Sequence, residues 1–308
     1  MTTIDAAELD LIRRSLRHVL DRFAPAEVPN ALLAEGWADL VDTDAAAAIT
    51  TLSEEAGRSR SAAPVVDLAV LHGAGLEADA TSVVVVGGSA LAGAERAQRF
   101  LWLSDDGIAV LDADAVDLSP AGGFDPALGL SRATAVRSGQ EAVGDATTAA
   151  AAIAAGRRAL ASQMIGAVDQ MLSETLEYIG VRHQYGRAIG SFQTVKHRMA
   201  EVAVAVTAAR AATTTAWQFA DTADGPLLAM GCKALAGRAH HLASTHCFQV
   251  HGGIAFTVEH GFHQWVRRGL LLDHLLGDHQ SLTREVGRTV IARGRPPRVP
   301  LLTDLATA

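Results

Sequence analysis

The sequence predicts a mostly α-helical protein with a small β-rich segment in its middle. From about residue 146 onward, long stretches without helix breakers repeat apolar residues at the 3.6-residue period of a buried helix face. Between about residues 81 and 136, short runs of β-branched and aromatic residues replace that period. We therefore expect an N-terminal helical domain (1–78), a middle β-domain (79–142) and a C-terminal helical bundle with a tail (143–308).

The first 75 residues have the pattern of short helices. Leu9, Ile12 and Leu16 recur at helical spacing, and Pro25 then closes that segment. Trp37 could serve as a ligand platform, but a lone tryptophan more often packs in a core. We expect Trp37 to be a core residue.

Three β-rich runs mark the middle segment: Val83–Val86, Phe100–Leu103 and Gly107–Leu111. Asp105-Asp106-Gly107 is a turn signal that should join the last two runs. The glycine-rich Gly87–Gly93 follows a strand, as a dinucleotide-binding loop would. It lacks two glycines of the G-x-G-x-x-G fingerprint, and no alternating βαβ pattern follows, so we expect no nicotinamide site.

The C-terminal half predicts an antiparallel bundle, with Asp145 or Thr147 at its start and Ser191 as the cap of the second helix. Turn signals separate the helical patterns, and the arginine- and proline-rich stretch after residue 293 indicates an extended arm. The expected helices are 146–180, 191–221, 225–248 and 273–292.

Composition narrows the functional class. The chain has 308 residues, 49% of them hydrophobic, and its longest apolar run is too short to span a bilayer. No charged-then-apolar leader opens the sequence, and Cys232 and Cys247 form no disulfide framework. A net charge of −8 argues against nucleic-acid binding. These features predict a soluble cytoplasmic protein with neither a membrane nor a nucleic-acid partner.

Eight of the twelve histidines fall between His240 and His279, so a metal site has to be considered. His260-x-x-His263 could supply a ligand pair, but no third ligand is evident, and we expect surface or interface histidines instead. His246 and Cys247 are helical neighbours whose side chains should point to different faces, so a cysteine nucleophile is not expected. Cys247 should be a small core residue.

The stretch that joins the first two long helices carries an arginine, aromatic rings and glycines. Arg182 and Tyr185 should lie at the end of the first helix, where a guanidinium can reach outward to an anion. Gly186 and Gly190 should allow a sharp backbone turn. The alternative role of Arg182 is to cap the preceding helix by binding its last carbonyls.

Two motifs in this half resemble the signature of the acyl-CoA dehydrogenases. One is Arg182-x-Gln184-Tyr185-Gly186 followed by Phe192-Gln193-x-x-Lys196, and the other is Gln249-Val-His-Gly252-Gly253 with Arg267-Arg268 further on. The resemblance implies that family's fold, with a shortened N-terminal helical domain, a reduced middle β-domain and a C-terminal four-helix bundle. It also implies an FAD seated mainly on a neighbouring subunit. The residues implied to hold the adenosine diphosphate end of that FAD are Arg182, Gln184, Tyr185, Gln249, Gly252 and Gly253.

The family's chemistry requires a carboxylate that removes the α-proton of an acyl-CoA thioester. By the resemblance, this base should lie at Leu276 or, as in some relatives, near Gly156, and neither residue is an acid. Asp278 and Glu177 are nearby acids that we expect to be solvated. The resemblance therefore implies no catalytic residue in this chain.

A chain with the FAD motifs and without the base resembles the short subunits of α2β2 acyl-CoA dehydrogenases. The implied partners are a longer, catalytic acyl-CoA dehydrogenase subunit, a bulky acyl-CoA such as a steroid-derived one, and an acceptor such as an electron-transfer flavoprotein. Two alternatives stay open: a self-sufficient homomeric dehydrogenase whose relocated base is Asp278, and a flavin-free scaffold.

Overall fold

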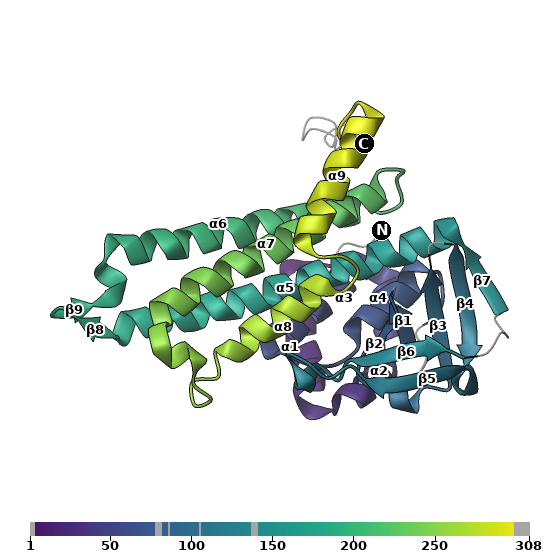
Figure 1. Cartoon of the computed structure of the whole chain (residues 1–308), viewed down its shortest axis with the longest axis horizontal. Helices are drawn as coiled ribbons and strands as arrows, with labels where there is room; N and C mark the ends of the chain where they lie inside the picture. Colours follow the sequence, from purple (N-terminus) through teal and green to yellow (C-terminus); the bar gives the residue numbers. More distant parts are fainter. Residues whose placement is uncertain (1–3, 78–81, 86, 105, 137–140, 299–308) are drawn as a thin grey trace.

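The computed structural model describes residues 4–77, 82–85, 87–104, 106–136 and 141–298. It contains an N-terminal group of helices, a seven-stranded sheet and a C-terminal helical bundle (Figure 1). The longest helix, α5 (Ala146–Val181), contacts the N-terminal helices, the sheet and the other bundle helices. This helix therefore links the three parts.

The N-terminal segment is helical, as predicted. An Asp5–Glu8 capping box begins α1, and α3 is kinked at Asp44, whose backbone angles are not helical. Trp37 is 4% exposed and belongs to the main hydrophobic core, which confirms its predicted role. The helices are α1 (Ala6–Arg22), α2 (Val28–Ala34), α3 (Trp37–Ser59) and α4 (Val65–Gly73).

The sheet has the strand order β5-β6-β2-β1-β3-β4-β7. Its pairs are antiparallel except for the parallel pair of β1 and β3. A small second core inside the sheet includes Phe100 and Leu111. The strands are β1 (Ser82–Val85), β2 (Ser89–Ala90), β3 (Arg99–Ser104), β4 (Gly107–Asp112), β5 (Val116–Pro120), β6 (Ser131–Ala135) and β7 (Glu141–Asp145).

All three predicted β-rich runs coincide with strands, and β3 and β4 form the expected hairpin. Val86 at the end of the first run and Asp105 of the predicted turn lie outside the described residues. The sequence patterns miss β2, β5, β6 and β7. These strands are short, and each contains at most two apolar residues, so their alternation is too brief to be recognised.

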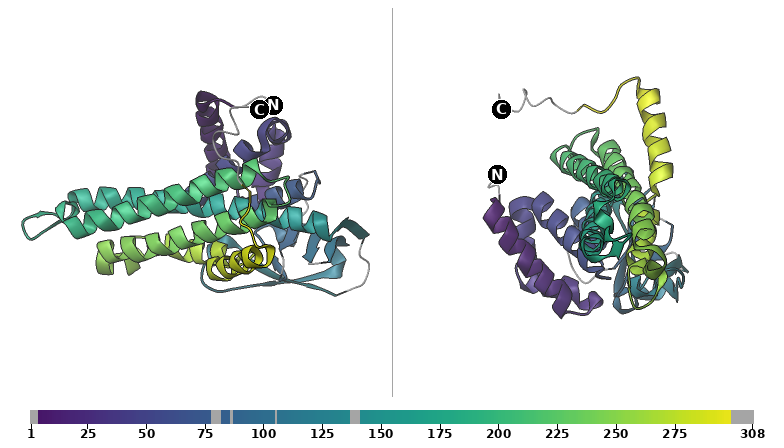
Figure 2. Two further views of the ribbon diagram at one scale, coloured as in Figure 1. Left: turned by 90° about the horizontal axis from the view of Figure 1, so that it is seen from above. Right: turned by 90° about the vertical axis from the view of Figure 1, so that its left-hand side faces the viewer.

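Four bundle helices lie side by side: α5, α6 (Gln193–Gln218), α7 (Gly225–His251) and α8 (His263–His274) (Figure 1). Asp145 caps α5 by accepting a hydrogen bond from the backbone N–H of Thr148, which confirms the predicted start. Figure 2 shows the N-terminal helices on one side of this bundle and α9 (His279–Arg293) on the other. No described helix is both long and apolar enough to cross a membrane.

The predicted fourth helix, 273–292, is confirmed over most of its length as α9, but its predicted start is wrong. A separate helix, α8, ends at His274, and a turn follows it in which Leu276 (φ 56°) and Gly277 (φ 99°) are left-handed. The sequence pattern misses α8 because Arg268 occupies a buried position, with its charge satisfied by distant parts of the chain. Its carboxylate partner, Asp125, lies 143 residues away in sequence.

The predicted capping role of Ser191 is also wrong. Helix α6 begins at Gln193 after Phe192, with no side-chain cap. Ser191 ends a short 3-10 turn (Ile189–Ser191), and its hydroxyl donates to the carbonyl of Ala188. The Ser191 side chain therefore stabilises the turn before the helix.

Candidate functional site

A two-stranded hairpin follows α5, formed by β8 (His183–Gln184) and β9 (Arg187–Ala188). Tyr185 (φ 51°) and Gly186 (φ 78°) form its turn, as predicted for Gly186. Gly190 does not adopt a positive φ, contrary to expectation. A Cβ there would lie 3.0 Å from the carbonyl oxygen of Ile179, so Gly190 instead allows close packing against the end of α5.

Arg182 is the C-terminal cap residue of α5, and its side chain is exposed. The backbone N–H of Arg182 donates to Tyr178, and its carbonyl accepts from Ile189 at 2.8 Å. Among the described residues, the guanidinium has no hydrogen bond or ion pair. The structure therefore gives no support to the alternative that this guanidinium caps helix carbonyls, and its donors are available to an anion.

Aromatic rings surround the hairpin turn. Tyr185 is 93% exposed and meets Phe192 edge-on, with ring centroids 6.3 Å apart. The guanidinium carbon of Arg187 lies 4.1 Å from the centre of the Phe192 ring, which is a cation–π contact. Phe192 thus supports both neighbours, and the exposed Tyr185 ring offers a flat surface to a ligand or a partner chain.

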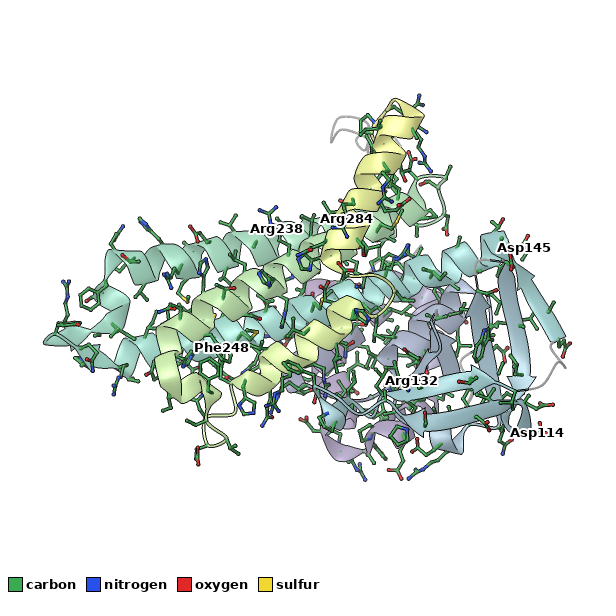
Figure 3. The ribbon with its side chains drawn as sticks, in the orientation of Figure 1. Asp114, Arg132, Asp145, Arg238, Phe248 and Arg284 are labelled. Atoms are coloured by element: carbon green, nitrogen blue, oxygen red, sulfur yellow. The ribbon has the colours of Figure 1, made fainter. Side chains whose placement is uncertain are left out.

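The second motif lies where α7 ends. Gln249 is exposed, and Gly252 (φ 68°) and Gly253 have no atoms within 4 Å of their Cβ positions. The open space beside these glycines would let a ligand approach the backbone closely. Phe248, which precedes this motif, lies near the same end of α7 (Figure 3).

A contact between α5 and α7 brings the two motifs together. The ring of His251 stacks on Tyr178 at 4.4 Å, and its Nε2 atom lies 3.1 Å from the hydroxyl of Thr175. Burial, with the nearby charge of His260, lowers the pKa of His251 to about 4, so the ring is neutral near pH 7. Because of this contact, the hairpin and the glycine pair lie at the same end of the bundle (Figures 1 and 2).

Sequence reasoning missed Tyr178 and His251 as positioning residues. Their only sequence signal is their position: Tyr178 lies four residues before Arg182, and His251 lies one residue before Gly252. The groups gathered at this end are a free guanidinium, an amide, an exposed ring and approachable glycine backbone. Such a set suits a pyrophosphate and an adenine, so these residues fit the ADP end of FAD.

The two positions implied for a catalytic base lie next to each other and are apolar. A Cβ at Gly156 would lie 2.7 Å from Cδ1 of Leu276 and 2.9 Å from Cγ2 of Val70. Leu276 is itself buried. Two positions 120 residues apart in sequence therefore meet at one place, and neither side chain there can accept a proton.

Buried cations hold the turn that carries Leu276. The ammonium of Lys233, which is fully buried, donates to the carbonyls of Asp273 at 2.7 Å and Gly277 at 2.6 Å. Nε of Arg157 donates to the carbonyl of Leu276 at 3.0 Å. Burial lowers the pKa of Lys233 to about 8. Hydrogen bonds from two cationic side chains therefore stabilise the backbone of this turn, although position 276 carries no acid.

Asp278 is the N-cap of α9. Its carboxylate accepts hydrogen bonds from the backbone N–H groups of Gln280 and Ser281. These bonds, with one from the hydroxyl of Ser281, lower the pKa of Asp278 to about 2. Such a carboxylate is a weak proton acceptor, and Glu177 is an exposed residue of α5.

Two of the histidines have local partners. His240 contacts the carbonyl of Trp265 at 3.2 Å, and His279 contacts Asp273 at 2.7 Å. In the part of the chain that the structure describes, no group of three or more histidine, cysteine or acidic side chains could hold a metal ion. Cys232 and Cys247 are both buried and free, and Cys247 packs in the main core as predicted.

The comparisons with known proteins identify the helical half of the chain. Residues 146–292 match the family model "Acyl-CoA dehydrogenase, C-terminal domain". "Acyl-CoA dehydrogenase IpdE2" of Mycobacterium tuberculosis is 39% identical over 127 residues, which are 41% of this chain and 39% of that protein. IpdE2 of Mycolicibacterium smegmatis is 34% identical over 41% of this chain and 40% of its own length. The chain thus spans about two fifths of the length of these relatives.

Solved structures match almost the whole chain. The "Tcur3481-Tcur3483 steroid ACAD G363A variant" has a TM-score of 0.78 at 19% identity, covering 94% of this chain and 98% of that one. A chain of the "ChsE4-ChsE5 complex from Mycobacterium tuberculosis" has a TM-score of 0.73 at 17% identity, with 98% and 100% covered. At these identities the likeness shows the fold.

The fold is therefore that of an acyl-CoA dehydrogenase, and residues 146–292 match the C-terminal domain of that family. The match of residues 146–292 to this family, whose cofactor is FAD, covers somewhat less than half of the chain.

Proposed function

We propose that this chain is the non-catalytic subunit of a heteromeric, FAD-dependent acyl-CoA dehydrogenase. In this proposal it contributes the ADP end of the FAD site, and a longer partner subunit supplies the catalytic base. The observation that carries the proposal is the apolar contact between Leu276 and Gly156 at the positions implied for the base. The two solved structures named above support it because each is named for a pair of different chains.

Each part of the site has a role in this proposal. Arg182 would pair with the pyrophosphate through its planar fork, while Gln184 and Tyr185 would contact the adenosine. Gln249 and the open backbone of Gly252 and Gly253 would form the opposite wall. When bound, FAD accepts the hydride that leaves the β-carbon of the acyl group. Leu276 is buried and apolar, and it cannot remove the α-proton.

The finer assignments extend the same proposal. The steroid named for one structural neighbour suggests a bulky, steroid-derived acyl-CoA as the substrate. Another structural neighbour, named "Electron transferring flavoprotein of Acidaminococcus fermentans", suggests that class of electron acceptor. An α2β2 assembly would place two copies of this chain beside two catalytic chains.

The location of the base provides the test. In the assembled complex, Asp278→Asn and Glu177→Gln should each change the rate of flavin reduction by less than about tenfold, or about 1.4 kcal/mol of barrier. Loss of a true general base should cost about 10²–10⁴-fold. The rate is followed by flavin absorbance in a single turnover with acyl-CoA, which keeps the electron acceptor out of the measurement.

Two outcomes would contradict the proposal. One is a collapse of the reduction rate in Asp278→Asn with FAD still bound, which would make this chain catalytic. The other is a homotetramer of this chain that retains one FAD per subunit and is reduced by acyl-CoA. A complex that never binds flavin would instead favour the scaffold alternative.

A separate prediction concerns the ADP end. Arg182→Ala should weaken FAD retention by about 1.5–3 kcal/mol, because it removes a charge-assisted hydrogen-bond donor from an exposed position without local partners. Arg182→Lys should recover only part of this loss, since a lysine cannot form the bidentate fork. Flavin dissociation constants and thermal midpoints are measured together. A lower midpoint with unchanged flavin affinity would show a purely structural role for Arg182.

A further inference from the structure

A second polar site lies away from the ADP-end residues. It is a pocket of about 460 Å³ between the end of α3, the loop that precedes the short turn Pro126–Leu128, and the first two turns of α8. Its charged lining consists of Arg60, Asp125, Arg267 and Arg268, together with His263. None of the six residues assigned to the ADP end lines this pocket.

The one carboxylate in this lining is already engaged. Nε of Arg268, a residue that is 3% exposed, donates to Asp125 at 2.5 Å. The Nη1 group of Arg268 donates to the backbone carbonyls of Arg60 at 2.7 Å and Ser61 at 2.6 Å. Asp125 and Arg268 therefore form a satisfied buried pair, and Asp125 has little capacity left to neutralise other charges.

Arg60 adds a second positive charge beside this pair. It ends α3 in a left-handed conformation (φ 57°), and its guanidinium carbon lies 4.6 Å from the centre of the Trp265 ring. Burial lowers the pKa of Arg60, and the positive charge of Arg268 lowers it further. Its buried Nε atom has no hydrogen-bond partner among the described residues. The neighbouring guanidinium thus repels Arg60, and the carboxylates of Glu174 and Asp125 offset this only in part.

Two further lining groups have no hydrogen-bond or ion-pair partner for the atoms named here, among the described residues. Arg267 is exposed; its guanidinium carbon lies 5.8 Å from the centre of the Phe124 ring, and it forms no ion pair within the described ranges. The Nδ1 atom of His263 is buried without a hydrogen-bond partner in that same part of the chain. Both groups belong to the first turns of α8, where the helix dipole adds partial positive charge.

We propose that this pocket binds the phosphate group of a small ligand, with Arg60 and Arg267 as the guanidinium ligands. Two guanidiniums beside a hollow favour a dianionic group, because each can offer paired N–H donors to its oxygens. The bound anion supplies the negative charge that the lining lacks. It also joins α3, the sheet and α8, so binding should raise the thermal midpoint of the protein.

The test uses inorganic pyrophosphate as the probe and isothermal titration calorimetry as the measurement. The full-length protein, in the assembly in which it is isolated, carries Arg182→Ala throughout, which removes the anchor of the ADP-end site. In this background, Arg267→Ala should weaken pyrophosphate binding by about tenfold or more, the value of one lost charge-assisted contact. Because Arg267 is exposed, this variant should fold normally.

Arg60→Ala should weaken binding by a similar factor. Arg60→Lys serves as the second variant, since it keeps the charge and should restore binding in part. The matched control is Arg284→Ala, because Arg284 is an exposed arginine of α9 (Figure 3) that does not line the pocket. This control should leave the dissociation constant unchanged.

A second titration uses adenosine 3′,5′-bisphosphate. It distinguishes a phosphorylated nucleotide from free phosphate or pyrophosphate as the ligand. Tighter binding of the nucleotide than of pyrophosphate assigns the pocket to a phosphorylated nucleotide, and equal or weaker binding assigns it to free phosphates. The proposal is overturned if pyrophosphate gives no more heat than sodium chloride of equal ionic strength. It is also overturned if Arg267→Ala and Arg60→Lys both bind as the unsubstituted pocket does.

Discussion

Gly166→Ala is expected to destabilise the protein by about 3 kcal/mol or more, as overpacking against a rigid backbone does. Gly166 lies on α5 where α3 crosses it, and an added Cβ would overlap the carbonyl oxygen of Glu54. Gly57 on α3 meets the carbonyl of Gln163 in the same way, so glycines bring both backbones into contact. Neither partner atom can rotate away.

Separation of these helices would also break the ion pairs that cross them. Asp169 of α5 accepts from Arg58 of α3 at 3.0 Å and from Arg210 of α6 at 2.6 Å. These partly exposed pairs each contribute little, but together they fix the orientation of α3 on the bundle. The loss in Gly166→Ala should therefore exceed that of an ordinary surface substitution.

The measurement is the midpoint of urea unfolding, with the slope checked for constancy. Gly180→Ala is the matched control, because Gly180 lies on the same helix with no atoms within 4 Å of its Cβ position. That variant should be as stable as the native protein or up to about 1 kcal/mol more stable, as helix propensity predicts. Equal midpoints for Gly166→Ala and the native protein would show that the α3–α5 contact is looser than described.

Lys233→Ala should be the second severe substitution, with an expected loss of about 3 kcal/mol. It leaves a cavity and deprives the carbonyls of Asp273 and Gly277 of their donor. The substitution also removes a charge whose burial is unfavourable, as the lowered pKa of Lys233 (about 8) indicates, and this offsets part of the loss in stability. The net effect stays destabilising, since Lys233 is fully buried between α7 and the turn before α9.

Lys233→Met separates the two causes. Methionine fills most of the volume without donating a hydrogen bond, so its loss should fall between that of Lys233→Ala and zero. The chain's other lysine, Lys196, is exposed on α6, and Lys196→Ala should change the unfolding midpoint little. An unfolding midpoint for Lys233→Ala as high as that of the Lys196→Ala control would refute the bridging role of Lys233.

The turn that contains Leu276 has an apolar side chain at the position where catalysis would need a proton acceptor. Lys233 and Arg157 hold the backbone of the turn, and Leu276 keeps a left-handed conformation that is costly for a leucine. A maintained turn without an acid is consistent with the proposal that the proton acceptor belongs to a partner subunit.

The sequence by itself determined the features that depend on local pattern. The start of α5 at Asp145, the β3–β4 hairpin and the helix-end position of Arg182 each follow from periodicity, capping or turn chemistry among close neighbours. The two motifs likewise predicted the fold class, because each is a short run of residues read in order. Features of this kind can be predicted without knowing which distant residues are in contact.

Only the tertiary structure decided the features that depend on residues far apart in sequence. α8 was missed because buried Arg268 finds its partners in Asp125 and at the end of α3. The meeting of Leu276 with Gly156, and of Tyr178 with His251, likewise depends on how the helices pack. A residue's pattern in sequence reports its own helix or strand, whereas its charge balance and its contacts are set by the surfaces that folding brings against it.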